Sequence, residues 1–151
     1  MVAQDGKNGE NAGRNDTKSR LLAAAELIVV EKGITGLSVR KVGQKAGLNP
    51  ALVTYHFGGI AGLLEELCTC NLDPLVAAWA DLPGPDADLE TLLRSWLAPL
   101  LAPAAFTPEG RALVVLDEIA SHGDGALGPR VIEQMESFSH RLNAAFAQHC
   151  L

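Results

Sequence analysis

The sequence of 151 residues predicts an all-α fold, and three observations support this prediction. Apolar residues recur at the i, i+3, i+4, i+7 spacing of a helix that buries one face, first at Leu21, Ala24, Ala25 and Ile28. No segment shows the alternation of apolar and polar residues that marks a half-buried strand. Glycines and prolines stand between the helical segments, where helices begin and end. A set of packed helices is therefore expected.

The chain begins with a polar, glycine-rich stretch, residues 1–16, which is expected to form a disordered tail. The apolar spacing then predicts a first helix over residues 17–32. Gly33 is expected to end this helix in a left-handed conformation.

Two short helices are expected next. Ser38 can accept a hydrogen bond from the first turn of a second helix, which Gly47 ends after about two turns. Asn49 is a favourable N-cap, and Pro50 suits the first helical position, where an amide hydrogen is not needed. A third helix is therefore expected from Pro50 to about Phe57.

The remaining residues predict longer helices that are separated by loops. Gly58 and Gly59 break the chain, and the stretch LPGPD at 82–86 is a loop. The expected helices cover 61–82, which Pro74 divides or bends; 89–96, which bends or ends near Pro99 and Pro103; 108–122; and 130–149.

Charge is unevenly distributed along the chain. Residues 1–58 carry a formal charge of +3, whereas residues 59–151 carry −9. This asymmetry favours binding of a polyanion by the N-terminal part and a different function for the C-terminal part, although a solvated surface can give the same pattern.

The cysteines and the hydropathy indicate a cytoplasmic protein. Three cysteines, Cys68, Cys70 and Cys150, lack a disulfide-type spacing, which favours a reducing compartment. Cys68 and Cys70 would point to different sides of one helix, so neither a metal site nor a cofactor is expected. The chain has no apolar run of membrane-spanning length, and its polar N-terminus is unlike a signal peptide.

The stretch VRKVGQKAGLNPALVTYHF has the spacing of a helix-turn-helix. Gly43 is small where the two helices would cross, and Val42, Ala46, Leu48 and Val53 would face a shared core. The exposed side of the second helix would carry Ala51, Thr54, Tyr55 and His56, at a width that fits the major groove of DNA, while Phe57 turns inward.

Structural alternatives stand beside this interpretation. Tyr55 and His56 could be packed core aromatics at a helix end, and Arg40, Lys41 and Lys45 could be only the solvated side of a helix. Trp79, Trp96 and Phe138 are interpreted as core or surface residues rather than ligand contacts. An enzyme is not expected: Ser121, His122 and Asp124 could be grouped as a catalytic set, but neighbouring residues on a helix diverge and no supporting loop motif is present.

Residues 17–67, about a third of the chain, resemble the DNA-binding head of the tetracycline-repressor (TetR) family of bacterial transcriptional regulators. The resemblance rests on the apolar residues before Gly33, on SVRKVGQKAGLNPALVTYHFG, and on the following helix with Leu63 and Leu64. It implies an all-helical homodimer that represses a promoter and releases double-stranded operator DNA when a small-molecule effector enters the C-terminal body.

The resemblance also implies roles for individual residues. Ser38 would lie near the DNA backbone, and Arg40 would touch a base or a phosphate. The remaining DNA-binding residues would be Asn49, Pro50, Ala51 and Thr54 at groove-facing positions, and Tyr55 and His56 at phosphate-contacting positions.

The sequence departs from the family in two places. Gly59 and Ile60 stand where the family usually has Ser or Asn followed by Lys, so a side-chain cap and a cationic phosphate contact are missing, although backbone amides could still face a phosphate. Family members usually also end with two antiparallel helices that form a dimer interface, and this chain has room for fewer.

The expected organisation is thus a disordered tail (1–16), a helix-turn-helix DNA-binding domain (17–60) and a helical effector-binding and dimerisation domain (61–151) that is incomplete at its C-terminus. The alternative function is that of a helical small-molecule-binding or interaction protein whose DNA-binding head is degenerate.

Overall fold

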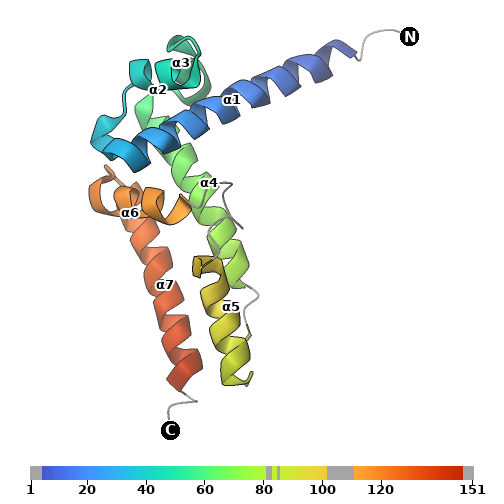
Figure 1. Cartoon of the computed structure of the whole chain (residues 1–151), viewed down its shortest axis with the longest axis vertical. Coiled ribbons are helices and arrows are strands. Elements are labelled where there is room, and N and C mark those ends of the chain that lie inside the picture. The colour runs from blue at the N-terminus through green and yellow to red at the C-terminus, as the bar shows by residue number, and fades with distance from the viewer. Residues whose placement is uncertain (1–4, 81–82, 85, 102–110, 148–151) are drawn as a thin grey trace. The chain divides into compact units, whose positions relative to one another are not determined.

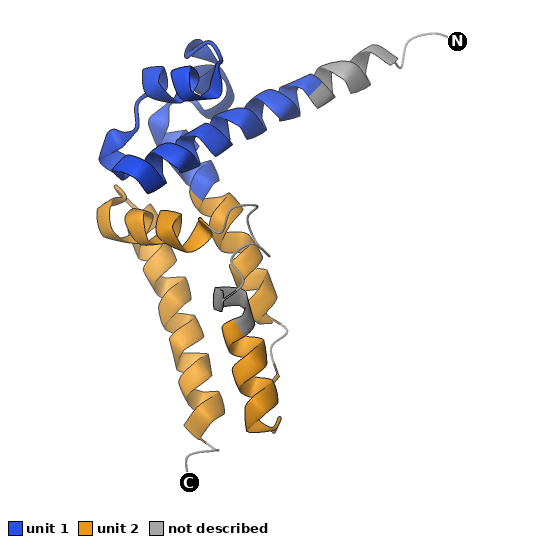
Figure 2. Cartoon of the chain, viewed as in Figure 1, with its two compact units in different colours: residues 1–67 blue, residues 68–151 orange. Residues whose placement is uncertain are grey.

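Helices account for nearly all of the backbone that the structure describes, as Figure 1 shows. The structure is a computed structural model, which describes residues 5–80, 83–84, 86–101 and 111–147. Over these ranges no strand is present, in agreement with the predicted all-α class. The chain divides into two compact units, Met1–Leu67 and Cys68–Leu151, and the division falls within one helix (Figure 2).

Unit 1 contains α1 (Asp5–Lys32), a single 3-10 turn (Ile34–Gly36), α2 (Val39–Ala46), α3 (Ala51–Phe57) and the first residues of α4 (Ile60–Ala80). Its core gathers apolar side chains from all four helices. These buried side chains are Leu21, Ala24, Ala25, Ile28, Val42, Val53 and Leu63. The predicted apolar faces of the first three helices are confirmed.

The N-terminal helix is longer than the sequence predicts. It begins at Asp5, whereas residues 1–16 were expected to form a disordered tail. Extending an existing helix fixes one residue for each hydrogen bond gained, so it costs much less than starting a new helix. The hydroxyl of Thr17 also donates to the carbonyl of Gly13 at 2.9 Å, and Arg14 gains a tertiary contact with Tyr55. The tertiary contact of Arg14 partly offsets the poor helix propensity of the glycines.

Unit 2 contains the rest of α4 together with α5 (Leu89–Leu101), α6 (Ala112–His122) and α7 (Leu127–Ala147). Pro74 lies inside α4, which is one helix rather than two. α5 continues past Pro99 to Leu101. α7 begins at Leu127, earlier than expected. The predicted start of the 108–122 helix, Pro103 and the end of the last predicted helix lie outside the described residues.

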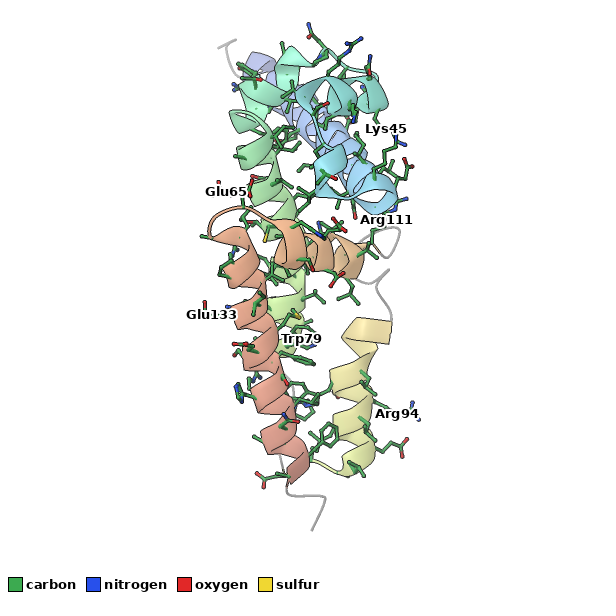
Figure 3. The ribbon with its side chains drawn as sticks, turned by 90° about the vertical axis from the view of Figure 1, so that its left-hand side faces the viewer. Lys45, Glu65, Trp79, Arg94, Arg111 and Glu133 are labelled. Carbon is green, nitrogen blue, oxygen red and sulfur yellow. The ribbon has the colours of Figure 1, made fainter. Side chains whose placement is uncertain are left out.

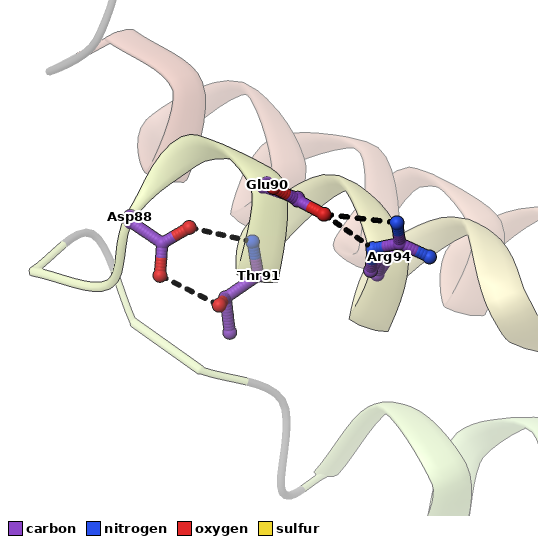
Figure 4. Close-up of polar contacts among 4 residues, drawn as sticks. All are labelled: Asp88, Glu90, Thr91 and Arg94. Carbon is purple, nitrogen blue, oxygen red and sulfur yellow. Dashed lines mark hydrogen bonds and ion pairs between the residues drawn. The ribbon is translucent and has the colours of Figure 1, made fainter.

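Asp88 caps the start of α5. Its carboxylate accepts hydrogen bonds from the amide of Thr91 at 3.0 Å and from the Thr91 hydroxyl at 2.6 Å (Figure 4). These hydrogen bonds lower the pKa of Asp88, the bond from the Thr91 side chain most strongly. One turn further along, Glu90 and Arg94 form an i, i+4 ion pair at 2.9 Å. Local chemistry thus fixes where α5 begins.

The predicted separation of Cys68 and Cys70 is confirmed, because Cys68 is fully buried whereas Cys70 is exposed. Burial raises the pKa of the Cys68 thiol. Cys150 lies outside the described residues. Among the helices of the described ranges, none combines the length and the hydropathy that a membrane crossing needs.

Gly43 is the position at which α2 packs closely against the start of α3. A Cβ atom there would lie 2.7 Å from the Cα of Pro50 and 2.8 Å from its nitrogen. We expect Gly43→Ala to destabilise the protein by about 1–3 kcal/mol, because backbone atoms cannot move aside as a flexible side chain can. Urea unfolding measures this change.

Gly13→Ala is the matched control, since a Cβ atom at Gly13 meets nothing within 4 Å. It replaces a helical glycine by alanine and is expected to stabilise by roughly 0.5–1 kcal/mol. Equal responses of the two variants would contradict the close approach at Gly43.

Candidate nucleic-acid interface

The ends of α2 and the start of α3 carry residues that the sequence marks as caps. The Ser38 Oγ accepts a hydrogen bond from the Lys41 amide at 3.2 Å, which caps α2. Gly47 ends α2 with φ 65° and ψ 33°, a left-handed conformation that favours glycine. The Asn49 Oδ1 then accepts from the Ala51 amide at 3.0 Å, with Pro50 already helical. The predicted caps at Ser38 and Gly47 are confirmed, whereas α3 begins at Ala51, one residue later than predicted, with Pro50 at its N-cap and Asn49 one residue before it.

The close approach of Gly43 to Pro50 brings the backbone of α2 against the first turn of α3, where larger side chains would hold the two apart. Val42 and Val53, one from each helix, are fully buried behind this crossing, and Ala46 and Leu48 pack against the same core. The geometry is that of a helix-turn-helix.

α3 buries one side and leaves the other in solvent. Ala51 and Thr54 are exposed, and 63% of Tyr55 is exposed, so the reading of Tyr55 as a core residue is wrong. His56 is partly buried and meets the Tyr55 ring edge-on, with 5.1 Å between ring centroids. Phe57 packs against the core, as predicted.

Arg14 joins this surface from α1 and was missed by the sequence analysis. Its guanidinium donates a hydrogen bond to the Tyr55 hydroxyl and lies 5.4 Å from the centroid of the Tyr55 ring. Together these side chains border an open hollow of about 440 Å³, lined by Gly13, Arg14, Thr17, Leu52, Tyr55 and His56. The contact was not predicted because residues 1–16 were expected to form a disordered tail. The one indication in the nearby sequence was Arg14 itself, a basic residue three positions before the expected start of the first helix.

Four of the basic residues in unit 1 hold its helices together. Lys18 pairs with Glu66 at 2.6 Å and Lys45 pairs with Glu31 at 2.9 Å, and Figure 3 labels Lys45 on this unit. The other two donate to backbone carbonyls that end helical turns: Arg20 to Ala46 at 3.0 Å and Lys41 to Gly36 at 3.2 Å.

Arg40 differs from these four residues. It is exposed, and its side chain forms no ion pair or hydrogen bond with any residue that the structure describes. For Lys45, the interpretation as a solvated side chain is replaced by a pairing role. Arg40 keeps its charge available for a ligand outside the protein.

The predicted residues fall into two groups. Asn49, Pro50, Ala51, Thr54, Tyr55 and His56 lie on α3 and at its start, whereas Ser38 and Arg40 lie at the start of α2. The hydroxyl of Ser38 is occupied by its capping bond, and the half-buried Pro50 is packed against Gly43. The exposed polar residues of this set are Arg40, Asn49, Thr54 and Tyr55.

The start of α4 shows how the chain replaces the missing cap. Gly59 has φ 127°, a conformation that L side chains rarely adopt, and its carbonyl accepts from the Leu63 amide at 3.1 Å. Ile60 packs against the core, and the first turn has no acidic side chain. A Cβ atom at Gly62 would lie 1.9 Å from the Phe57 carbonyl oxygen, so glycine is required there. The turn from α3 into α4 is therefore set by backbone packing.

The residues considered for catalysis are not assembled. Ser121, His122 and Asp124 are all exposed, and His122 instead lies 3.6 Å from Glu118, one helical turn earlier. Across the described ranges, no three His, Cys, Asp or Glu residues are grouped as a metal ion would need.

In unit 1, the short helix α3 is exposed on one side and is supported by α1, α2 and α4, and α2 crosses it at Gly43. This arrangement defines a helix-turn-helix DNA-binding domain. Residues 21–67 match the family described as "Bacterial regulatory proteins, tetR family". A curated relative, described as the HTH-type transcriptional regulator YttP of Bacillus subtilis (strain 168), is 37% identical over 51 residues. This match covers 34% of the chain but only 25% of YttP, so the chain spans about a quarter of that relative.

Solved structures resemble more of the chain. SCO7518 of Streptomyces coelicolor A3(2), described as a transcriptional regulator, aligns with a TM-score of 0.57 and 27% identity over 88% of this chain and 75% of that one. NalD is described as the secondary repressor of the MexAB-OprM multidrug efflux pump in Pseudomonas aeruginosa. It aligns with a TM-score of 0.51 over 89% of this chain and 69% of NalD. At 23% identity the likeness to NalD concerns the fold alone. The similarity to the tetR family thus lies in the N-terminal unit, over residues 21–67.

Ile60 provides a test of the missing phosphate contact. Ile60→Lys is expected to steepen the dependence of log affinity for duplex DNA on log salt by about one unit, because one more phosphate would be neutralised. Fluorescence anisotropy at several salt concentrations measures this slope. Asn143→Lys, which adds the same charge at an exposed position in unit 2, is the control. An unchanged slope for Ile60→Lys, or equal slopes for the two variants, would contradict the prediction.

Proposed function

We propose that this chain is a sequence-specific DNA-binding transcriptional regulator, which represses transcription and is released from its operator by a small molecule. The observation that carries the proposal is the exposure of Thr54 and Tyr55 on α3, while Val53 on its opposite side is fully buried. A short helix presented in this way fits the major groove, and flanking cations and amides can contact phosphates.

The resemblance of most of the chain to solved regulators supports the same function for the whole protein. We further propose that it acts as a homodimer in the bacterial cytoplasm. One helix-turn-helix covers a single half-site, and two half-sites read together give useful affinity and specificity. The acidic C-terminal unit would take the effector, since its net negative charge disfavours contact with DNA.

Titration of the duplex that flanks the gene tests this function by fluorescence anisotropy. Arg40→Ala is expected to weaken binding about tenfold, because an exposed cation that meets DNA is lost. Tyr55→Ala removes a phosphate contact and the partner of Arg14, and is expected to weaken binding at least as much. Arg94→Ala removes an exposed arginine of α5 and is expected to leave affinity unchanged.

Equal effects of Arg40→Ala and Arg94→Ala would contradict the assignment of α2 and α3 to the interface. No preference for the flanking duplex over a scrambled one would favour the alternative, a helical small-molecule-binding protein with a degenerate head. Sedimentation of the complex at micromolar concentration should give two chains for each operator, and tight binding by one chain would contradict the dimer.

A further inference from the structure

Three aromatic rings from three helices meet inside unit 2. Trp79 of α4 stacks on Phe138 of α7, with 3.9 Å between ring centroids and 23° between ring planes. Trp96 of α5 approaches the same phenyl ring, at 5.3 Å and 44°. Phe138 is therefore shared by the two indoles. In Figure 3, Trp79 lies beside α7 on the side that faces α5.

Both indoles of this aromatic cluster are buried, and both have an unused donor. Trp79 is 3% exposed and Trp96 is 2% exposed, and neither indole Nε1 has a hydrogen-bond partner among the described residues. An indole N–H can only donate, and buried donors are nearly always paired. Two unpaired buried donors are difficult to explain by packing alone, since apolar side chains would not carry this desolvation cost.

The edge of the cluster is polar and positively charged. A cavity of about 30 Å³ adjoins it, lined by Val76, Trp79, Gln134, Ser137, Phe138 and Arg141. The guanidinium of Arg141 lies 5.4 Å from the centroid of the Trp96 ring. This cavity holds about one water molecule, so a larger guest must displace a side chain. Phe138 is the ring best placed to move, because it is only partly buried and lines the cavity.

We propose that the aromatic cluster of Trp79, Trp96 and Phe138 is the effector site, and that its ligand is a planar, mainly apolar molecule with hydrogen-bond acceptors. The ligand takes the place of the Phe138 ring between the indoles and accepts hydrogen bonds from their N–H groups. Arg141 at the edge favours a neutral or anionic ligand over a cation. This inference rests on the proposed function, since it gives that function its effector.

The chain contains two tryptophans, both in the cluster, so tryptophan emission, excited at wavelengths that Tyr55 does not absorb, reports on this site. Quinoline and coumarin are suitable probes, because each is a flat two-ring molecule with an acceptor, and naphthalene is their counterpart without one. Quinoline and coumarin are expected to quench the emission saturably and to bind about tenfold more tightly than naphthalene, the factor that one buried hydrogen bond supplies.

Two variants separate the hydrogen bonds from the packing. Trp79→Phe and Trp96→Phe keep an aromatic ring but remove one N–H each. At least one of them is expected to lose the tenfold preference for quinoline over naphthalene, as measured by the fluorescence of the remaining tryptophan. Leu93→Ala, at an exposed position of α5, is the control and is expected to keep the preference. A purely structural role would change the melting temperature without changing the ratio of the two affinities.

Absence of saturable quenching by both acceptor probes, or equal affinities for quinoline and naphthalene, would overturn the inference. DNA binding is measured separately and needs no probe. A protein that binds its operator but neither acceptor probe keeps the proposed function and loses this site. A protein that binds the probes through Trp79 or Trp96 but ignores DNA keeps the site and loses the proposed function.

Discussion

The contact on which unit 1 depends is the close approach of two backbones at Gly43 and Pro50. Because a Cβ atom at Gly43 would collide with Pro50, only glycine lets α3 lie this near to α2. The position of α3 then decides which residues face solvent. Val53 is pressed into the core, and Thr54 and Tyr55 are left outside as a consequence. The exposed surface of α3 thus follows from a steric constraint on the backbone at Gly43 and Pro50.

Cations in unit 1 serve structure as much as they serve recognition. Lys18 and Lys45 are paired with carboxylates, and Arg20 donates to the end of α2. Exposed ion pairs of this kind contribute about 0–1 kcal/mol each, so their main effect is to reduce the charge that remains for a polyanion. Arg40 is the basic side chain of α2 that keeps its charge available. Binding by such a head would rely more on shape and on a few contacts than on a strong positive field.

Features set by local chemistry were predictable from the sequence. Ser38, Gly47 and the Asn49-Pro50 pair marked the helix ends to within one residue, because a cap depends on residues within one turn of itself. Features set by contacts between distant residues were not predictable. The extension of α1 to Asp5 accompanies the contact between Arg14 and Tyr55, and local composition had favoured a tail instead. The same holds for the cluster of Trp79, Trp96 and Phe138, whose members come from three different helices.

The central claim is that α3 is the surface that meets DNA, and nuclear magnetic resonance of the labelled protein tests it most directly. During titration with its operator duplex, the largest amide shifts should fall on residues 51–56 of α3 and on the first turn of α4, where unpaired amides can meet a phosphate. The core residues of unit 2 should move little. Shifts confined to residues 68–147, with α3 unchanged at saturation, would contradict the claim.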